Sequence, residues 1–158
     1  MFNIAAGTPC PQFSLPDEDG TIVTLDTLKG RPFVLYVYPK DDTPGCTTEA
    51  LDFTALLPEF EAAGVAVFGV SPDTVQKHCR FRDKHKLSVR LLSDEDRSLI
   101  VALGLWVEKL NYGRRSMGVQ RASYLFDADA KLVNAWPKVS VKGHAAEVLE
   151  AARALGHP

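Results

Sequence analysis

Two uninterrupted apolar runs constrain the fold more than any other feature of this chain. Residues 33–38 (FVLYVY) and 65–70 (VAVFGV) contain no charged side chain and are rich in β-branched and aromatic residues. Runs of this length and composition are typical of strands that are buried on both faces of a sheet. A long segment with helical periodicity separates them. The sequence therefore predicts a right-handed βαβ unit with two parallel strands.

The segment between the two runs predicts a helix from about Cys46 to Ala63. Its apolar residues recur at helical spacing, at Ala50, Phe53, Leu57 and Phe60. Pro58 removes one hydrogen bond from such a helix, so we expect a kink or a break near Leu57. Gly64 follows at the position where a glycine commonly ends a helix.

The remaining elements are two hairpins, a short strand and three further helices. Residues 13–15 and 21–25 flank a DEDG turn and predict an N-terminal hairpin, and residues 122–126 and 132–136 predict a second one. Residues 104–119 are glycine-rich and are expected to be irregular. The other expected elements are a polar helix that follows Ser71–Asp73 and ends near Lys86, a strand at Leu91–Leu92, a helix from Ser93 through Leu103 and a last helix from His144 to Leu155.

This order of elements predicts an α/β protein with a central mixed sheet flanked by helices. It fits a thioredoxin-like fold with an added N-terminal β-hairpin. The chain has 158 residues and contains no repeat, low-complexity tract or dividing linker. We therefore expect a single domain over residues 1–158.

Composition argues against several classes of partner. The net charge of −2 gives no electrostatic reason to bind nucleic acid or a membrane surface. No apolar run approaches the roughly 20 residues that span a bilayer. The first residues, MFNIAAGTPCPQF, lack the features of a secretion signal. Three cysteines, Cys10, Cys46 and Cys79, are too few and too scattered for a disulfide scaffold or a zinc site. We therefore expect a cytoplasmic protein.

Cys46 is the strongest candidate for chemistry. It follows a Thr-Pro-Gly turn after the first apolar run, at the predicted start of a helix. The unpaired N–H groups and the dipole of a helix N-terminus favour the ionised, reactive form of a thiol. The alternative is a buried structural thiol, which is the commoner role of a free cysteine. The position at the C-terminal end of a strand favours chemistry, because α/β folds place their ligands there.

Three other residues can serve a reactive Cys46. Thr43 supplies a hydroxyl three residues before the sulfur, although it could equally cap the helix. Glu49 lies one turn after Cys46, where an acid also suits the helix dipole, and its carboxylate requires a cation nearby. Arg121 precedes the strand at residues 122–126 and can pair with Glu49 while it directs other N–H groups toward Cys46. The alternative for Arg121 is a solvated surface side chain.

The string Pro39-x-x-x-Thr43-x-x-Cys46 resembles the active-site signature of the peroxiredoxins. The longer string YPKDDTPGCTTEA is similar to the peroxiredoxin Q (bacterioferritin comigratory protein) subfamily. The similarity covers nearly all of the chain and continues through the strings GVSPDTVQKH, LLSDED, LGLWVEK, MGVQRASYLFD and WPKVSVKGHAAEVL.

This resemblance implies a thiol peroxidase for hydrogen peroxide and alkyl hydroperoxides that needs no metal or organic cofactor. Cys46 would attack the terminal peroxide oxygen and become a sulfenic acid. Thr43 would hydrogen-bond the thiolate and the peroxide, and Arg121 would stabilise the charge on sulfur and oxygen. Pro39 would shield the site from water. The resemblance further implies reduction by thioredoxin or a similar thiol donor, and a monomer or weak homodimer.

The chain departs from many of these relatives at the second, resolving cysteine. They carry it five residues after the first, where this chain has Leu51. Cys79 is the next candidate, although some relatives place theirs one turn later, near Arg82. A disulfide between Cys46 and Cys79 would require the two α-carbons within about 7 Å and hence local unwinding of the first helix. This route and a one-cysteine cycle with an external thiol both stay open, and Cys10 is expected to be structural.

The helix that carries Cys79 is expected to bury Val75, His78 and Phe81 on one face, with Cys79 at its edge. An ionised thiolate needs no base, so His78, His85 and His144 are expected to be surface or packing residues.

Two rival functions use the same sulfur. A disulfide oxidoreductase on the same fold is disfavoured because the chain contains no CxxC motif. A peroxide-sensing thiol switch would react with peroxide through Cys46 but would turn over poorly with thioredoxin.

Overall fold

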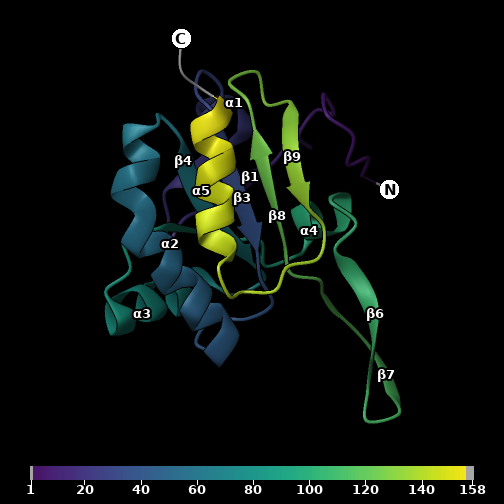
Figure 1. The fold of residues 1–158 in the computed structure, drawn as a ribbon. Coiled ribbons are helices and arrows are strands. Elements are labelled where there is room, and N and C mark those ends of the chain that lie inside the picture. The colour runs from purple at the N-terminus through teal and green to yellow at the C-terminus, as the bar shows by residue number, and fades with distance from the viewer. Residues whose placement is uncertain (1, 156–158) are drawn as a thin grey trace.

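A five-stranded mixed sheet forms the centre of the structure, a computed structural model that describes residues 2–155 (Figure 1). β3 (Phe33–Val37) pairs in parallel with β4 (Ala66–Ser71), and β4 with β5 (Arg90–Ser93), whereas β8 (Ala122–Phe126) is antiparallel to both β3 and β9 (Leu132–Trp136). The predicted mixed sheet and parallel βαβ unit are therefore confirmed. In spatial order the strands are β5, β4, β3, β8 and β9.

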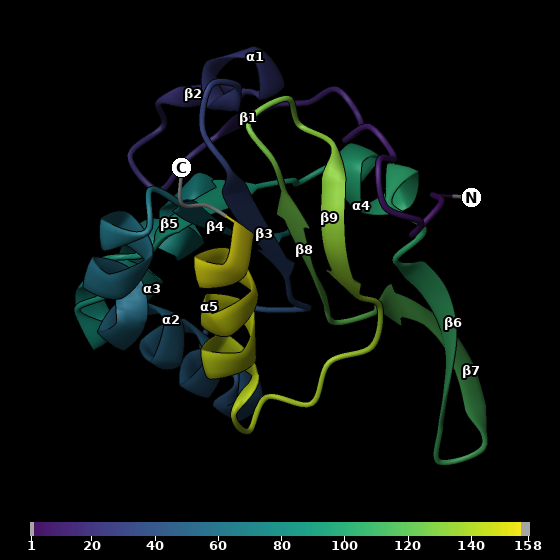
Figure 2. The same ribbon diagram turned by 45° about the horizontal axis from the view of Figure 1, so that its top comes forward.

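The sheet separates two apolar cores, because successive side chains of a strand point to opposite faces. Tyr36 of β3 enters one core, which α2 (Pro44–Ala62) and α5 (His144–Leu155) cover. Leu35 enters the other, which the N-terminal segments and α4 (Ser98–Ala102) cover. Figure 2 shows α2 and α5 on one side of the sheet, with β1 (Ser14–Pro16), β2 (Ile22–Thr24) and α1 (Leu25–Leu28) beyond one end of its strands. All five residues of β3 are buried, which explains its unbroken apolar sequence.

The predicted N-terminal hairpin is confirmed as β1 (Ser14–Pro16) and β2 (Ile22–Thr24), which pair antiparallel. A short helix, α1 (Leu25–Leu28), follows and was not predicted. Thr24 and Thr27 form a reciprocal cap, in which each hydroxyl accepts the backbone N–H of the other. Four residues are too few to show helical periodicity, so only the cap could have revealed α1.

Helix α2 runs without interruption from Pro44 to Ala62, so of the expected kink or break near Leu57 the break does not occur. Pro58 does lack its N–H, but Phe53 and Phe60 are fully buried on either side of it. These two anchors hold the helix against the sheet across the missing hydrogen bond. The predicted end is confirmed: Gly64 has a φ of +76° and donates to the carbonyl of Glu61 at 2.9 Å.

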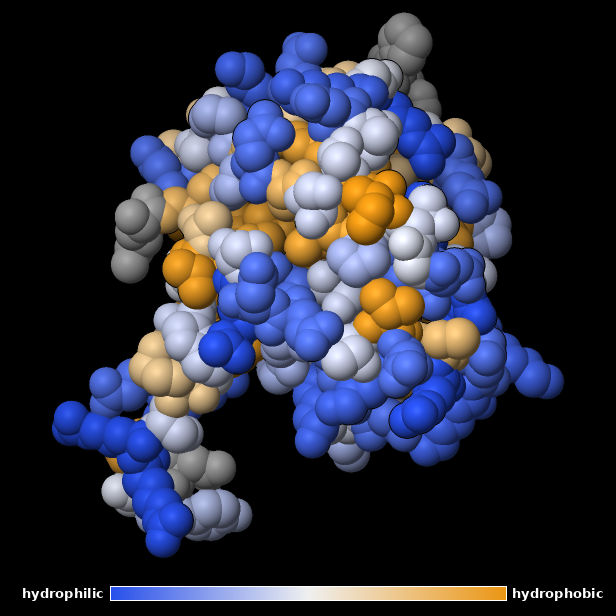
Figure 3. Space-filling view, turned by 180° about the vertical axis from the view of Figure 1, so that it is seen from behind, coloured by the Kyte–Doolittle hydropathy of each residue, from blue (hydrophilic) through white to orange (hydrophobic). Residues whose placement is uncertain are grey.

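Residues 104–119 are not irregular, as was expected, but contain a hairpin of β6 (Trp106–Asn111) and β7 (Arg114–Val119). Its two-residue turn, Tyr112-Gly113, has positive φ at both positions, which matches the right-handed twist of paired strands. Figures 1 and 3 show the hairpin projecting from the body of the molecule, with hydrophilic side chains near its tip. Because most of its residues are exposed, the sequence lacks the apolar alternation that predicts a strand.

The helices at the ends of the parallel strands complete the fold. α3 (Val75–His85) follows β4 as predicted, but α4 starts five residues later than the expected Ser93. Asp94 lies before α4 and accepts N–H groups from Leu99 and Ile100 at 3.3 and 2.7 Å, so it caps the helix from a distance. None of the helices within residues 2–155 has the length and apolar composition needed to span a bilayer.

Candidate active site

Cys46 lies in the first turn of α2, directly after the loop that leaves the carboxyl end of β3. Pro44 occupies the first helical turn, where its missing N–H costs nothing and its fixed φ suits the helix. The cysteine is only 2% exposed and packs with Tyr36, Tyr38 and Ala50. The sulfur is therefore held at a helix N-terminus and within a largely dry environment.

The guanidinium of Arg121 contacts Cys46 and Glu49 at the same time. Its Nη2 donates to Cys46 Sγ at 3.1 Å, and its Nη1 donates to Glu49 Oε1 at 2.6 Å. The Arg121 side chain is 16% exposed, so the alternative of a solvated surface arginine is wrong. Pairing of Val37 with Ala122 brings Arg121 close to Cys46 and Glu49, because it sets the start of β8 beside the end of β3.

The charges of this group are shaped by burial. Burial raises the pKa of Glu49 to about 7, although the charge of Arg121 and its hydrogen bond act to lower it. Burial alone would lower the pKa of Arg121, but Glu49 and Cys46 together hold it above its ordinary value. Glu49 is 1% exposed, and its second oxygen has no hydrogen-bond partner among the described residues. At neutral pH, Glu49 is therefore partly protonated while the arginine stays charged.

Thr43 and Pro39 border the site without contacting the sulfur through a hydrogen bond. The Thr43 hydroxyl donates to the carbonyl of Lys40 at 2.9 Å, and it accepts no N–H group of α2. Its hydrogen is therefore directed away from Cys46 in this conformation, and its side chain is not a helix cap either. Pro39 is half-buried at the start of the loop.

Gly45 lies next to the guanidinium and was not singled out from the sequence. A Cβ atom at this position would lie 3.4 Å from Arg121 Nη2. Because glycine carries no side chain, it does not crowd the guanidinium at this point.

The structure does not join Cys79 to Cys46, since all three cysteines are free. Cys79 is half-buried on α3, as expected, and its sulfur accepts a hydrogen bond from Arg82 Nη2 at 3.4 Å. Cys10 is buried, and burial raises its pKa to about 12, which keeps it a thiol at neutral pH.

No role was predicted for Asp41, which lies inside the Pro39–Thr43 loop, and His78 was expected to be a surface or packing residue. Both are buried, and they contact each other. The contact could have been suspected from two features of the sequence: an acid between two residues of the signature, and a histidine on the buried face of the helix that became α3.

A thioredoxin-like sheet that carries a lone cysteine against an arginine, and no CxxC motif, defines the class of thiol peroxidases. The sequence matches the AhpC/TSA family over residues 6–135. It is 42% identical to Peroxiredoxin Bcp of Bacillus subtilis (strain 168) over 147 residues, which cover 93% of this chain and 94% of that protein. The chain belongs to this family, among the Bcp/PrxQ peroxiredoxins, and is a thiol peroxidase.

Further relatives agree with this assignment. Peroxiredoxin Bcp of Xanthomonas campestris pv. campestris is 45% identical over 148 residues, with 92% of each chain covered. A crystal structure of a cysteine-to-serine variant of PrxQ from Xylella fastidiosa superposes with a TM-score of 0.90. That protein is 36% identical, and the match covers 96% of this chain and 97% of the other. The predicted thioredoxin-like fold is thereby confirmed.

We predict that Glu49 makes folding stability depend on pH in a way that a Glu49→Gln variant does not. Unfolded chains ionise this group near its ordinary pKa of 4.5, whereas the folded protein keeps the proton to about 7. The stability that the raised pKa contributes is therefore fully present below about pH 4.5 and is lost as the pH rises to about 7. Denaturant unfolding should show wild type losing up to about 3 kcal/mol relative to Glu49→Gln over this range. A constant difference between the two proteins would contradict the assignment.

Proposed function

We propose that this protein reduces hydrogen peroxide and alkyl hydroperoxides with Cys46 as the attacking nucleophile. Family membership supports the reaction class, and the contact of Arg121 Nη2 with Cys46 Sγ at 3.1 Å supports the choice of sulfur. A 44% identical protein, the bacterioferritin comigratory protein of Xanthomonas campestris, was crystallised in a study of its alkyl peroxide reduction activity. Its TM-score of 0.86, with 90% of each chain covered, supports the same substrate class here.

In the proposed reaction the Cys46 thiolate attacks the terminal oxygen of the hydroperoxide. A sulfur–oxygen bond forms, the oxygen–oxygen bond breaks, and the leaving alkoxide or hydroxide takes up a proton to give an alcohol or water. The sulfur becomes a sulfenic acid. The oxygen–oxygen bond is weak, so the displacement requires alignment and charge stabilisation rather than a metal or an organic cofactor.

The other site residues assist this step in distinct ways. Arg121 directs an N–H group at the position where negative charge develops on oxygen, and Glu49 fixes the orientation of the guanidinium. Thr43 reaches the peroxide when its hydroxyl rotates away from the Lys40 carbonyl. Pro39, at the start of the loop, limits the access of water.

The sulfenic acid is then reduced by one of two routes. In the first, the Cys79 thiol displaces water to form a disulfide, which thioredoxin or a similar dithiol reduces. In the second, an external thiol attacks Cys46 directly and a second thiol releases it. The structure has Cys46 2% exposed and Cys79 on a different helix, so the first route requires local unwinding of α2.

We propose that residues 1–158 form a single domain, that the protein is a monomer or weak homodimer, and that it acts in the cytoplasm. The continuous sheet from β5 to β9 supports the first of these.

We predict that Cys46→Ser abolishes thiol-dependent peroxide consumption, because the hydroxyl of serine is a far weaker nucleophile than a thiolate. The measurement is steady-state loss of hydrogen peroxide with a thioredoxin system, and Cys10→Ser, at another buried cysteine, is the matched control. Substantial activity in Cys46→Ser would refute the proposal. Single oxidation of wild type without turnover by thioredoxin would instead favour a peroxide-sensing switch.

We predict that the mass of the oxidised protein distinguishes the two reduction routes. One equivalent of peroxide is added to the reduced protein, and its intact mass is measured under non-reducing conditions. Loss of two hydrogens that disappears in Cys79→Ser would identify the disulfide route. A retained oxygen atom in wild type would contradict that route and identify the one-cysteine cycle.

A further inference from the structure

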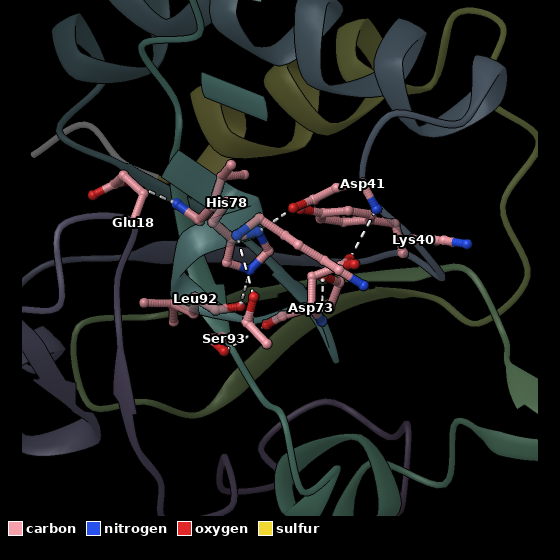
Figure 4. Close-up of polar contacts among 12 residues, drawn as sticks. Glu18, Lys40, Asp41, Asp73, His78, Leu92 and Ser93 are labelled. Atoms are coloured by element: carbon pink, nitrogen blue, oxygen red, sulfur yellow. Dashed lines mark hydrogen bonds and ion pairs between the residues drawn. The ribbon is translucent and has the colours of Figure 1, made fainter. Parts of the chain in front are cut away.

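A buried contact between an acid and a histidine lies beside the loop that precedes Cys46. His78 Nδ1 lies 2.6 Å from Asp41 Oδ2, and the side chains are 0% and 5% exposed. His78 Nε2 lies 3.0 Å from the carbonyl of Leu92. Figure 4 shows the imidazole between the loop residue Asp41 and Leu92 of β5. The histidine therefore connects the loop to the central sheet through α3.

The two hydrogen bonds of the His78 ring require two protons. A neutral imidazole supplies only one of them, and an ionised Asp41 supplies none. A carbonyl oxygen only accepts, so Nε2 donates to Leu92. Between Nδ1 and Asp41 Oδ2 a second proton is required, and it is carried by either the imidazolium or the carboxylic acid. The hydroxyl of Tyr38 donates to the other oxygen, Oδ1, at 2.6 Å. Both Asp41 oxygens are thus engaged, and the buried pair carries no net charge.

The backbone of the loop is fastened in the same place. The Asp41 N–H group donates to Asp73 Oδ2 at 2.8 Å, and the Ser71 hydroxyl donates to the same oxygen at 2.6 Å. The carboxylate and imidazole atoms of Asp41, Asp73 and His78 lie within 4.8 Å of one another, which is a spacing that metal ligands also show. Here the facing atoms are occupied by hydrogen bonds within the chain. The cluster therefore holds the loop in place through hydrogen bonds.

The rest of the contact between the loop and α3 is weaker. Asp42 accepts hydrogen bonds from Lys84 at 2.6 Å and His85 at 2.8 Å, but the Lys84 and Asp42 side chains are 62% and 42% exposed. A cavity of about 200 Å³ lies between the loop and α3, lined by Asp41 and Phe81 among others. Because solvent screens exposed pairs and the cavity removes packing, the buried pair is the principal contact.

We propose that Asp41 and His78 are positioning residues for the thiol peroxidase reaction. The pair holds the loop from Tyr38 to Thr43 against α3, and the loop leads without a further residue into the first turn of α2. It thereby sets the distance between Cys46 Sγ and the guanidinium of Arg121. This inference rests on the proposed function of Cys46 and adds residues that do not touch the sulfur.

Two substitutions of His78 test the contact with Asp41, because each removes the imidazole ring and keeps one of its two hydrogen-bond donors. The amide nitrogen of asparagine lies where Nδ1 lies, so His78→Asn keeps a donor toward Asp41 and loses the bond to Leu92. The amide nitrogen of glutamine lies where Nε2 lies, so His78→Gln keeps a donor toward Leu92 and loses the bond to Asp41. We would measure the rate constant for single-turnover oxidation of the reduced protein by hydrogen peroxide. The free energy of unfolding of each variant would be measured alongside it.

We expect His78→Gln to slow the oxidation of Cys46 roughly tenfold, because a displaced loop misaligns the sulfur, and His78→Asn to restore most of the rate. Asp41→Ser, whose side chain ends short of the imidazole, breaks the contact from the loop side and should match His78→Gln. It also keeps the test decisive if His78→Gln does not fold. His85→Asn is the matched control, because its amide nitrogen falls short of the Nε2 position and so loses the contact to Asp42, along with the edge-on packing against Phe81. It should oxidise at the wild-type rate.

Wild-type rates in both His78→Gln and Asp41→Ser would overturn the inference. Equal slowing in His78→Asn and His78→Gln would also overturn it. The oxidation rate would then follow the loss of folding stability in both variants and not the contact to Asp41, which only His78→Asn keeps. These outcomes leave the role of Cys46 untouched. Full peroxidase activity in Cys46→Ser would instead refute the proposed function itself.

Discussion

The whole site depends on one guanidinium that is shared between a sulfur and a carboxylate. Arg121, the residue before β8, reaches Cys46 and Glu49 of α2, which lie 75 and 72 residues away along the chain. Its planar fork can donate in two directions at once, which a lysine ammonium cannot do with the same geometry. Burial makes both contacts stronger, and it also raises the pKa of Glu49 to about 7, so the arginine charge is only partly offset. The carboxyl group thus orients the arginine without neutralising it.

The fold serves this contact through the pairing of β3 with β8. Antiparallel pairing of Val37 with Ala122 sets the start of one strand beside the end of the other. The loop after β3 then delivers Cys46 into the first turn of α2, and the residue before β8 is Arg121. The buried pair of Asp41 and His78 adds a second constraint, because it connects the same loop to α3. Two strand ends and one helix start are therefore enough to assemble the chemistry.

Much of this could be predicted, and the gaps have physical causes. Fully buried strands leave long apolar runs, so β3 and β4 were evident, and a local motif marked Cys46 and Glu49. The β6–β7 hairpin was missed because solvent surrounds it and leaves no alternating pattern. Asp41 and His78 were missed because their pairing spans 37 residues, and each alone resembles an ordinary loop acid or packing residue. Pro58 does not break α2, because the packing of Phe53 and Phe60 holds the helix together across the missing hydrogen bond.

The most direct measurement of the central claim is the rate constant with which hydrogen peroxide oxidises the reduced protein when Arg121 is changed to methionine. Methionine keeps an unbranched apolar stem and removes both N–H contacts. If the shared guanidinium stabilises the charge that develops on sulfur and oxygen, the rate constant falls roughly a hundredfold or more while the protein stays folded. A folded Arg121→Met variant that is oxidised at the wild-type rate would contradict the account.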